Sequence, residues 1–125
     1  MTSLQQKYLP LALRLFGIAF MALYLITSIF PDTWMWEPRQ ADYEEMIIGV
    51  YFVLGAFMFL AAKDPIKHLS LIWFAAISSI VHGLIMFGQA LRDPMDSANM
   101  MGDIPVIIAV GLILVWLTPR APKAD

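Results

Sequence analysis

Four long apolar stretches constrain the fold of this chain more than any other feature. They cover residues 8–30, 46–62, 69–91 and 104–117, and short connections that contain proline and charged residues separate them. Crossing the hydrocarbon core of a bilayer takes about 20 apolar residues, so the first and third stretches are long enough to span it. The second and fourth reach that length only with their upstream flanks, residues 43–45 and 99–103.

Apolar stretches of this length predict helices, because backbone polar groups in lipid must find their hydrogen-bond partners within the same segment. Charged residues make up 14% of the chain, against roughly 25% in a soluble domain. We therefore expect an all-α integral membrane four-helix bundle of up-down-up-down topology, with residues 1–125 as one domain. Its helices are expected at about residues 8–30, 43–62, 68–91 and 103–117. Asp103 is the expected N-cap of the last helix, because Pro105 follows it closely.

The distribution of basic residues predicts the orientation of the bundle. Four spans place both termini on one side, and six of the eight basic residues lie on that side: Lys7, Arg14, Lys63, Lys67, Arg120 and Lys123. Arg39 and Arg92 lie on the other side. By the positive-inside rule, both termini are cytoplasmic. Eight of the ten acidic residues fall on the outer side: Asp32, Glu37, Asp42, Glu44, Glu45, Asp93, Asp96 and Asp103. These carboxylates form either a solvated rim or part of a binding site.

A polar stripe on the third helix is the strongest candidate site. At 100° per residue, His82, Met86, Gln89 and Asp93 share one helical face. We expect a pocket in the outer half of the bundle, closed by Glu44 or Glu45 from the second helix and by Asp103 from the fourth. Ionisable groups inside membranes are usually functional, but His82 and Gln89 could equally make only interhelical hydrogen bonds.

Two kinds of cation would suit this pocket. A hard divalent cation would use the carboxylate oxygens and Gln89. Copper(I) would prefer the imidazole of His82 with the thioether of Met86, although methionine is also a common packing residue.

Missing motifs favour a protein that is not an enzyme. The chain has no cysteine, which excludes thiolate metal sites, iron–sulfur clusters and cysteine nucleophiles. It contains no His-Glu-x-x-His motif, no phosphate-binding glycine loop and no serine elbow. It also has no basic aromatic surface of the kind that binds nucleic acid.

Three segments, YEEMIIGVYFVLGAF, HLSLIWFAAISSIVHGLIMFGQA and GDIP, resemble an uncharacterised family of small bacterial inner-membrane proteins. This resemblance implies location in the bacterial inner membrane and carries no activity. It also implies a histidine shortly before the Gly-Asp pair, where this chain has Met100 and Met101, a departure that puts a metal site in doubt. The architecture is similar to that of DoxX-type four-helix proteins, some of which accompany quinone-linked oxidoreductases.

Three functions remain open from the sequence. The first is an accessory or structural subunit of a larger membrane complex, since the chain has no loop large enough for a separate domain. The second is a protein that binds a cation or small polar ligand in the outer pocket, and the third is a quinone- or metal-linked redox subunit. The expected partners are the bilayer and either other membrane subunits or further copies of the chain. The small residues Ala75, Ser79 and Gly83 form an edge for close packing with a partner or within the monomer.

Overall fold

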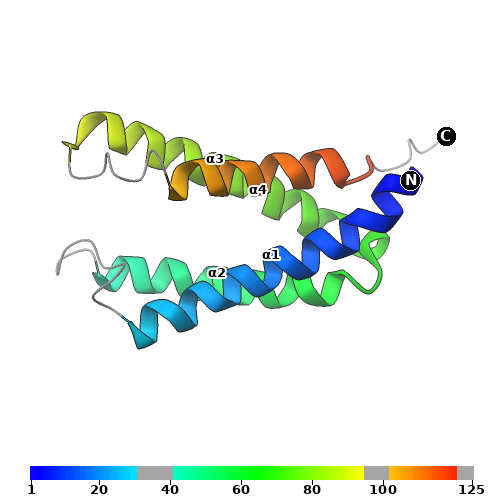
Figure 1. Ribbon diagram of the computed structural model, residues 1–125, viewed down its shortest axis with the longest axis horizontal. Helices are drawn as coiled ribbons and strands as arrows, with labels where there is room; N and C mark the ends of the chain where they lie inside the picture. The colour runs from blue at the N-terminus through cyan, green and yellow to red at the C-terminus, as the bar shows by residue number, and fades with distance from the viewer. Residues whose placement is uncertain (31–40, 95–101, 121–125) are drawn as a thin grey trace. The chain divides into compact units, whose positions relative to one another are not determined.

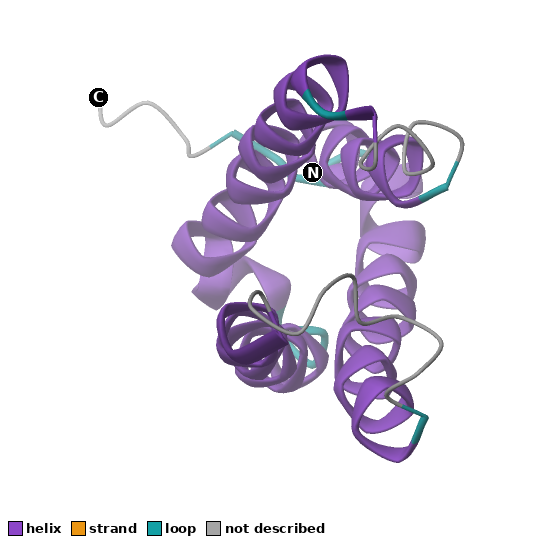
Figure 2. Cartoon of the chain, turned by 90° about the vertical axis from the view of Figure 1, so that its left-hand side faces the viewer, coloured by secondary structure: helices purple, strands orange, loops and turns teal. Residues whose placement is uncertain are grey.

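The computed structural model describes residues 1–30, 41–94 and 102–120 of the chain, and these residues form helices and their connections (Figure 2). The α-helices are α1 (Ser3–Ile29), α2 (Ala41–Ala61), α3 (Leu69–Arg92) and α4 (Asp103–Leu117), and a short 3-10 helix, η2 (Pro65–His68), precedes α3. The described ranges contain no strand. The all-α prediction is therefore confirmed for this part of the chain, with four α-helices at the four apolar stretches.

Helix α1 begins five residues before its expected start because the chain provides a capping box at Thr2 and Gln5. The amide of Gln5 donates to Thr2 Oγ1 at 3.3 Å, and the amide of Thr2 donates to Gln5 Oε1 at 3.0 Å. These reciprocal bonds satisfy two amides that would otherwise lack partners at a helix start. Pro10 lies inside α1, where it has no N–H to donate to the preceding turn.

The connection between α2 and α3, residues 62–68, is tightly turned. After α2 ends, the amides of Lys63 and Asp64 donate to the carbonyls of Leu60 and Ala61, each at 3.2 Å. Pro65 then opens η2 and is buried.

The start of α4 corrects the expected cap. Gly102 occupies the N-cap position and makes no side-chain cap bond, so Asp103 is the first helical residue. Asp103 therefore lies at the positive end of the helix dipole. This end stabilises an acidic side chain in the first turn as well as at the N-cap. At the other end, the hydroxyl of Thr118 donates to the carbonyl of Leu114 at 2.5 Å, and Pro119 follows.

The chain divides into two compact units. One comprises Met1–Leu9 with Pro65–Asp125, and the other comprises Pro10–Asp64. The first unit holds the antiparallel pair of α3 and α4 together with the first residues of α1, and the second holds the antiparallel pair of α2 and the rest of α1 (Figure 1). A single four-helix bundle assembled from both units stays a prediction.

Helices α1 and α2 touch through two glycines. A Cβ atom added to Gly55 would lie 2.5 Å from the carbonyl oxygen of Gly17, and one added to Gly17 would lie 2.6 Å from that of Gly55. Towards the end of α1, Phe20 meets Tyr51 edge-on, with ring centroids 5.1 Å apart. The ring centroids of Tyr24 and Phe52 are 5.5 Å apart. Backbone contact at a small-residue crossing, flanked by aromatic pairs, is a packing mode that membrane helices use.

Helices α3 and α4 pack along a seam of small residues. The buried side of α3 carries Ile72, Ala75, Ala76, Ser79, Gly83 and Ala90. Gly83 meets Ile107 and Ile108 of α4, and Gly111 of α4 meets Ala76 and Ile80 of α3. Gly83, one residue of the predicted close-packing edge, therefore packs within the monomer.

Candidate functional site

The register between α3 and α4 determines which polar residues can meet. Gly83 lies opposite Ile107 and Ile108, and Gly111 lies opposite Ala76 and Ile80. Asp103 precedes Ile107 and Ile108 by four or five residues. Because the helices are antiparallel, it lies level with the α3 residue that follows Gly83 by about four or five positions. Asp103 is therefore level with residues 87–88 of α3.

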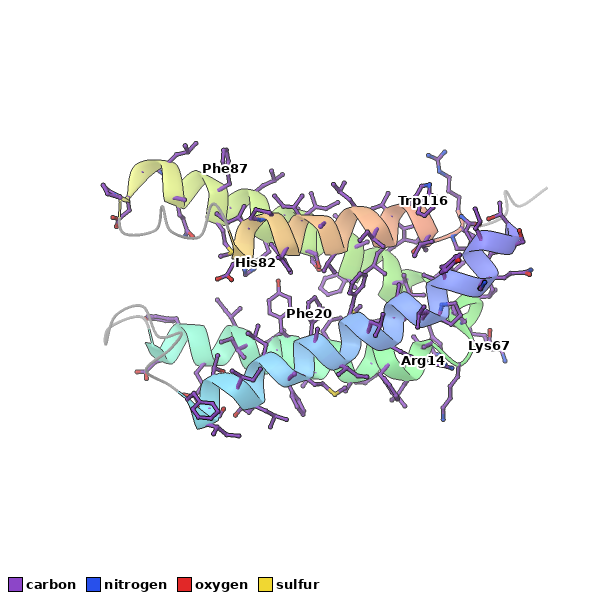
Figure 3. The ribbon with its side chains drawn as sticks, viewed as in Figure 1. Arg14, Phe20, Lys67, His82, Phe87 and Trp116 are labelled. Atoms are coloured by element: carbon purple, nitrogen blue, oxygen red, sulfur yellow. The ribbon has the colours of Figure 1, made fainter. Side chains whose placement is uncertain are left out.

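His82, Met86 and Asp103 are the residues of the predicted pocket that lie at similar levels on the α3–α4 pair, and the pocket itself stays a prediction. The register puts Asp103 about 8 Å along the helix axis from His82 and about 2 Å from the level of Met86. All three residues are half-buried. His82 is labelled in Figure 3, on the part of α3 that faces the first turns of α4. An imidazole, a thioether and a carboxylate thus lie within two helical turns of one another.

Gln89 and Asp93 differ from these three residues in their exposure. Both are exposed, although Ala90, which lies further along α3 than Gln89, is buried. Asp93 caps the end of α3, and its amide donates to the carbonyl of Gln89 at 2.9 Å. Asp93 follows His82 by eleven residues, about 16 Å along the axis, so one small ligand cannot reach both. The stripe therefore consists of a half-buried inner part and an exposed outer part.

Glu44 and Glu45 lie near the start of α2, in the other unit. Glu45 is exposed, and the side chain of Glu44 is outside the described residues. Their closing of the pocket stays a prediction. Within residues 1–30, 41–94 and 102–120, no group of three or more His, Asp or Glu side chains is arranged to hold a metal ion. The predictions of a divalent cation or copper are not tested by this arrangement. Met100, Met101 and the topology residues Asp32, Glu37, Arg39, Asp96 and Lys123 lie outside the described residues.

Ser79 is a buried polar residue whose importance the sequence did not reveal. It is fully buried, and its hydroxyl has no hydrogen-bond partner among the described residues. Ser78, its neighbour, donates instead to the carbonyl of Ala75 at 3.3 Å. Thr27 likewise satisfies its hydroxyl within its own helix, at the carbonyls of Leu23 and Tyr24. Serine and threonine in apolar helices usually bond to the preceding turn, so the sequence gives no sign that Ser79 differs.

Comparison with protein families adds one finding to this geometry. Residues 3–123, nearly the whole chain, match a family of unknown function, DUF6632. The chain belongs to DUF6632. No curated protein and no solved structure matches it.

Membership of DUF6632 confirms the predicted resemblance to an uncharacterised family. It brings no activity, substrate or cofactor to the residues described above. The likeness to DoxX-type proteins is not shown by any comparison and stays a prediction.

Proposed function

We propose that this chain is a multi-pass integral membrane protein that works as an accessory subunit of a larger membrane complex. The observation that supports membrane insertion is the exposure of large apolar side chains on every α-helix. Val50 and Trp116 are each 68% exposed, Ile29 is 66% exposed and Phe74 is 62% exposed. Apolar surface that extends over all the helices is stable in lipid and would drive aggregation in water.

Helix length supports the same proposal. Ser3–Ile29 and Pro65–Arg92 are long and apolar enough to cross a membrane. Glu45–Ala61 and Asp103–Leu117 are shorter apolar segments. The 15 residues of α4 extend about 22 Å, less than the roughly 30 Å of a hydrocarbon core. We infer that α2 and α4 also cross, with flanking residues or local bilayer thinning making up the difference.

The surface that the helices leave available for contact supports the accessory role. The small residues of each pair are used within it, at Gly17 with Gly55 and at Gly83 and Gly111. What remains outside is apolar helix surface, suited to lipid or to the helices of another subunit. The connections between the helices are too short to form a catalytic domain.

Purification from native membranes tests this role. The full chain is extracted with a mild detergent and analysed by blue-native electrophoresis and mass spectrometry. We expect the chain to stay in the membrane after alkaline carbonate washing and to co-purify with larger membrane proteins. Recovery only as a monomer, or only with its own copies, would reject the accessory role, and release by carbonate would reject membrane insertion.

A second function is supported by the half-buried group of His82, Met86 and Asp103. We propose as the alternative that this group binds a cation or small polar ligand on the outer side, or serves a redox partner. Elemental analysis and the visible spectrum of the purified protein test both possibilities. In His82→Gln, a bound species should disappear while the helix content is unchanged. A wild-type protein that carries neither metal nor chromophore would reject a bound cation and a redox cofactor at this group.

A further inference from the structure

Arg14 is the charged residue that the proposed membrane location leaves hardest to explain. It follows the start of α1 by eleven residues, and its side chain is exposed. It makes no ion pair with a carboxylate of the described residues. An arginine on the lipid-facing side of a spanning helix is costly unless its guanidinium extends to the headgroups or finds an anion there.

Lys63 provides a second cation near Arg14, at the end of α2 in the same unit. Gly17 of α1 lies against Gly55 and Phe59 of α2. Arg14 precedes Gly17 by three residues and Lys63 follows Phe59 by four, and both steps lead toward the same end of this antiparallel pair. The Cα atoms of Arg14 and Lys63 are therefore separated by about 2–8 Å along the helix axis. Figure 3 labels Arg14 on α1, near this end of α2.

Helical phase places both cations on one side of the α1–α2 pair. Viewed from the start of α1, Arg14 is turned about 60° clockwise from Gly17. Lys63 lies in the turn that follows α2, where its amide bonds to the carbonyl of Leu60. Viewed from the start of α2, a rotation of about 100–120° per residue turns Lys63 about 40–60° clockwise from Phe59. Because the helices run in opposite directions, two clockwise offsets fall on the same side. Both side chains are exposed there, and both are long and flexible enough to reach a common point.

Exposed apolar side chains lie on the same side of the α1–α2 pair, further along the helices from the end that carries Arg14 and Lys63. Ile18, one turn beyond Arg14, is 50% exposed, and Phe59, one turn before Lys63, is 39% exposed. Two cations at one end of an exposed apolar strip match the shape of a phospholipid, with its phosphate at the cations and an acyl chain along the strip.

We propose that Arg14 and Lys63 together bind the phosphate of one anionic phospholipid in the leaflet that faces the chain termini. This inference rests on the proposed membrane insertion. The planar guanidinium of Arg14 donates two parallel hydrogen bonds to phosphate oxygens, and the ammonium of Lys63 adds a point charge. The second positive charge makes the site prefer a lipid with net negative charge over a zwitterionic one.

The test uses the full chain in nanodiscs of equal parts phosphatidylglycerol and phosphatidylcholine, with retained lipids counted by native mass spectrometry. Wild-type protein should retain phosphatidylglycerol over phosphatidylcholine by about 30-fold, as expected for two such cation–phosphate contacts. Arg14→Gln with Lys63→Gln should lose the preference, and each single change should lower it about fivefold. Arg14→Lys with Lys63→Arg should keep it, and so should Arg92→Gln, a matched loss of charge at the other end of a helix.

Each remaining outcome rejects the proposal for a different reason. Equal preference in wild type and in the double Gln variant means that the two residues do not form the site. An equal loss in Arg92→Gln means that only the total charge matters. Displacement of the lipid by inorganic phosphate means that the acyl chain contributes nothing and the site is for a free anion. In all three cases the protein is still inserted, whereas failure to enter nanodiscs would reject membrane insertion itself.

Discussion

The crossing of α1 and α2 at Gly17 and Gly55 makes the clearest prediction about stability. In Gly55→Ala, the added methyl would lie 2.5 Å from the carbonyl oxygen of Gly17, 2.9 Å from Phe20 Cβ and 3.2 Å from the amide of Met21. Two of these atoms belong to the backbone and cannot rotate away. The first distance must rise by about 0.9 Å to reach ordinary contact at 3.4 Å, so the helices must move apart.

Separation of this size has a calculable cost. A radial gap of about 0.5–1 Å forfeits a quarter to a half of each dispersion contact, and overpacking of this kind costs about 1–3 kcal/mol. Gly49→Ala is the matched control on the same helix, because its methyl would meet only Tyr24 Cε2, at 3.9 Å. Both substitutions gain roughly 1 kcal/mol of helix propensity. The difference between their free energies of unfolding therefore measures the cost of the clash at the crossing alone.

Reversible unfolding of the purified protein in mixed micelles, followed by circular dichroism during SDS titration, measures this difference. We expect Gly55→Ala to be less stable than Gly49→Ala by about 2 kcal/mol. Equal stability of the two variants would show that α1 and α2 do not meet at Gly55, and the proposed arrangement of this pair would be wrong.

Three further changes test other parts of the fold. Gly111→Ala should cost about 1–3 kcal/mol in the same titration because it separates α4 from α3, while Gly88→Ala on α3 should cost nothing. Thr2→Ala breaks the capping box with Gln5 and should cost about 1 kcal/mol, seen as roughly fivefold faster amide exchange in the first turn of α1; unchanged exchange would exclude the cap. Ser79→Ala removes a buried hydroxyl without a partner and should leave stability unchanged or raise it by about 1 kcal/mol; a clear loss would show that the hydroxyl is bonded.

The helices could be predicted from the sequence because their apolar stretches are long and separated by proline. The expected ranges 68–91 and 103–117 agree with α3 and α4 to within one residue at each end. The earlier start of α1 was also readable, since Thr2 and Gln5 have capping-box spacing. Asp103 as N-cap was wrong by one residue, because glycine and aspartate are both favoured at that position.

The candidate site was predictable only in part. Helical phase groups His82 with Met86, and both are half-buried, but it could not show that Gln89 and Asp93 are exposed. Their exposure depends on how α3 packs against its neighbours, and its pairing with α4 is set by the fit of Gly83 and Gly111 against the facing helix. Periodicity within one helix carries no information about such pairing. The unpartnered hydroxyl of Ser79 is invisible for the same reason.

Cysteine accessibility in intact cells tests the central claim most directly, because the natural chain has no cysteine to interfere. Single cysteines are placed at Gln40, Ser97 and Lys123 and exposed to a thiol reagent that cannot cross membranes. Four spans with cytoplasmic termini predict labelling at Gln40→Cys and Ser97→Cys without permeabilisation, and at Lys123→Cys only after it. Protection at positions 40 and 97 together with labelling at 123 would contradict the orientation, and equal labelling of all three only after lysis would contradict membrane crossing.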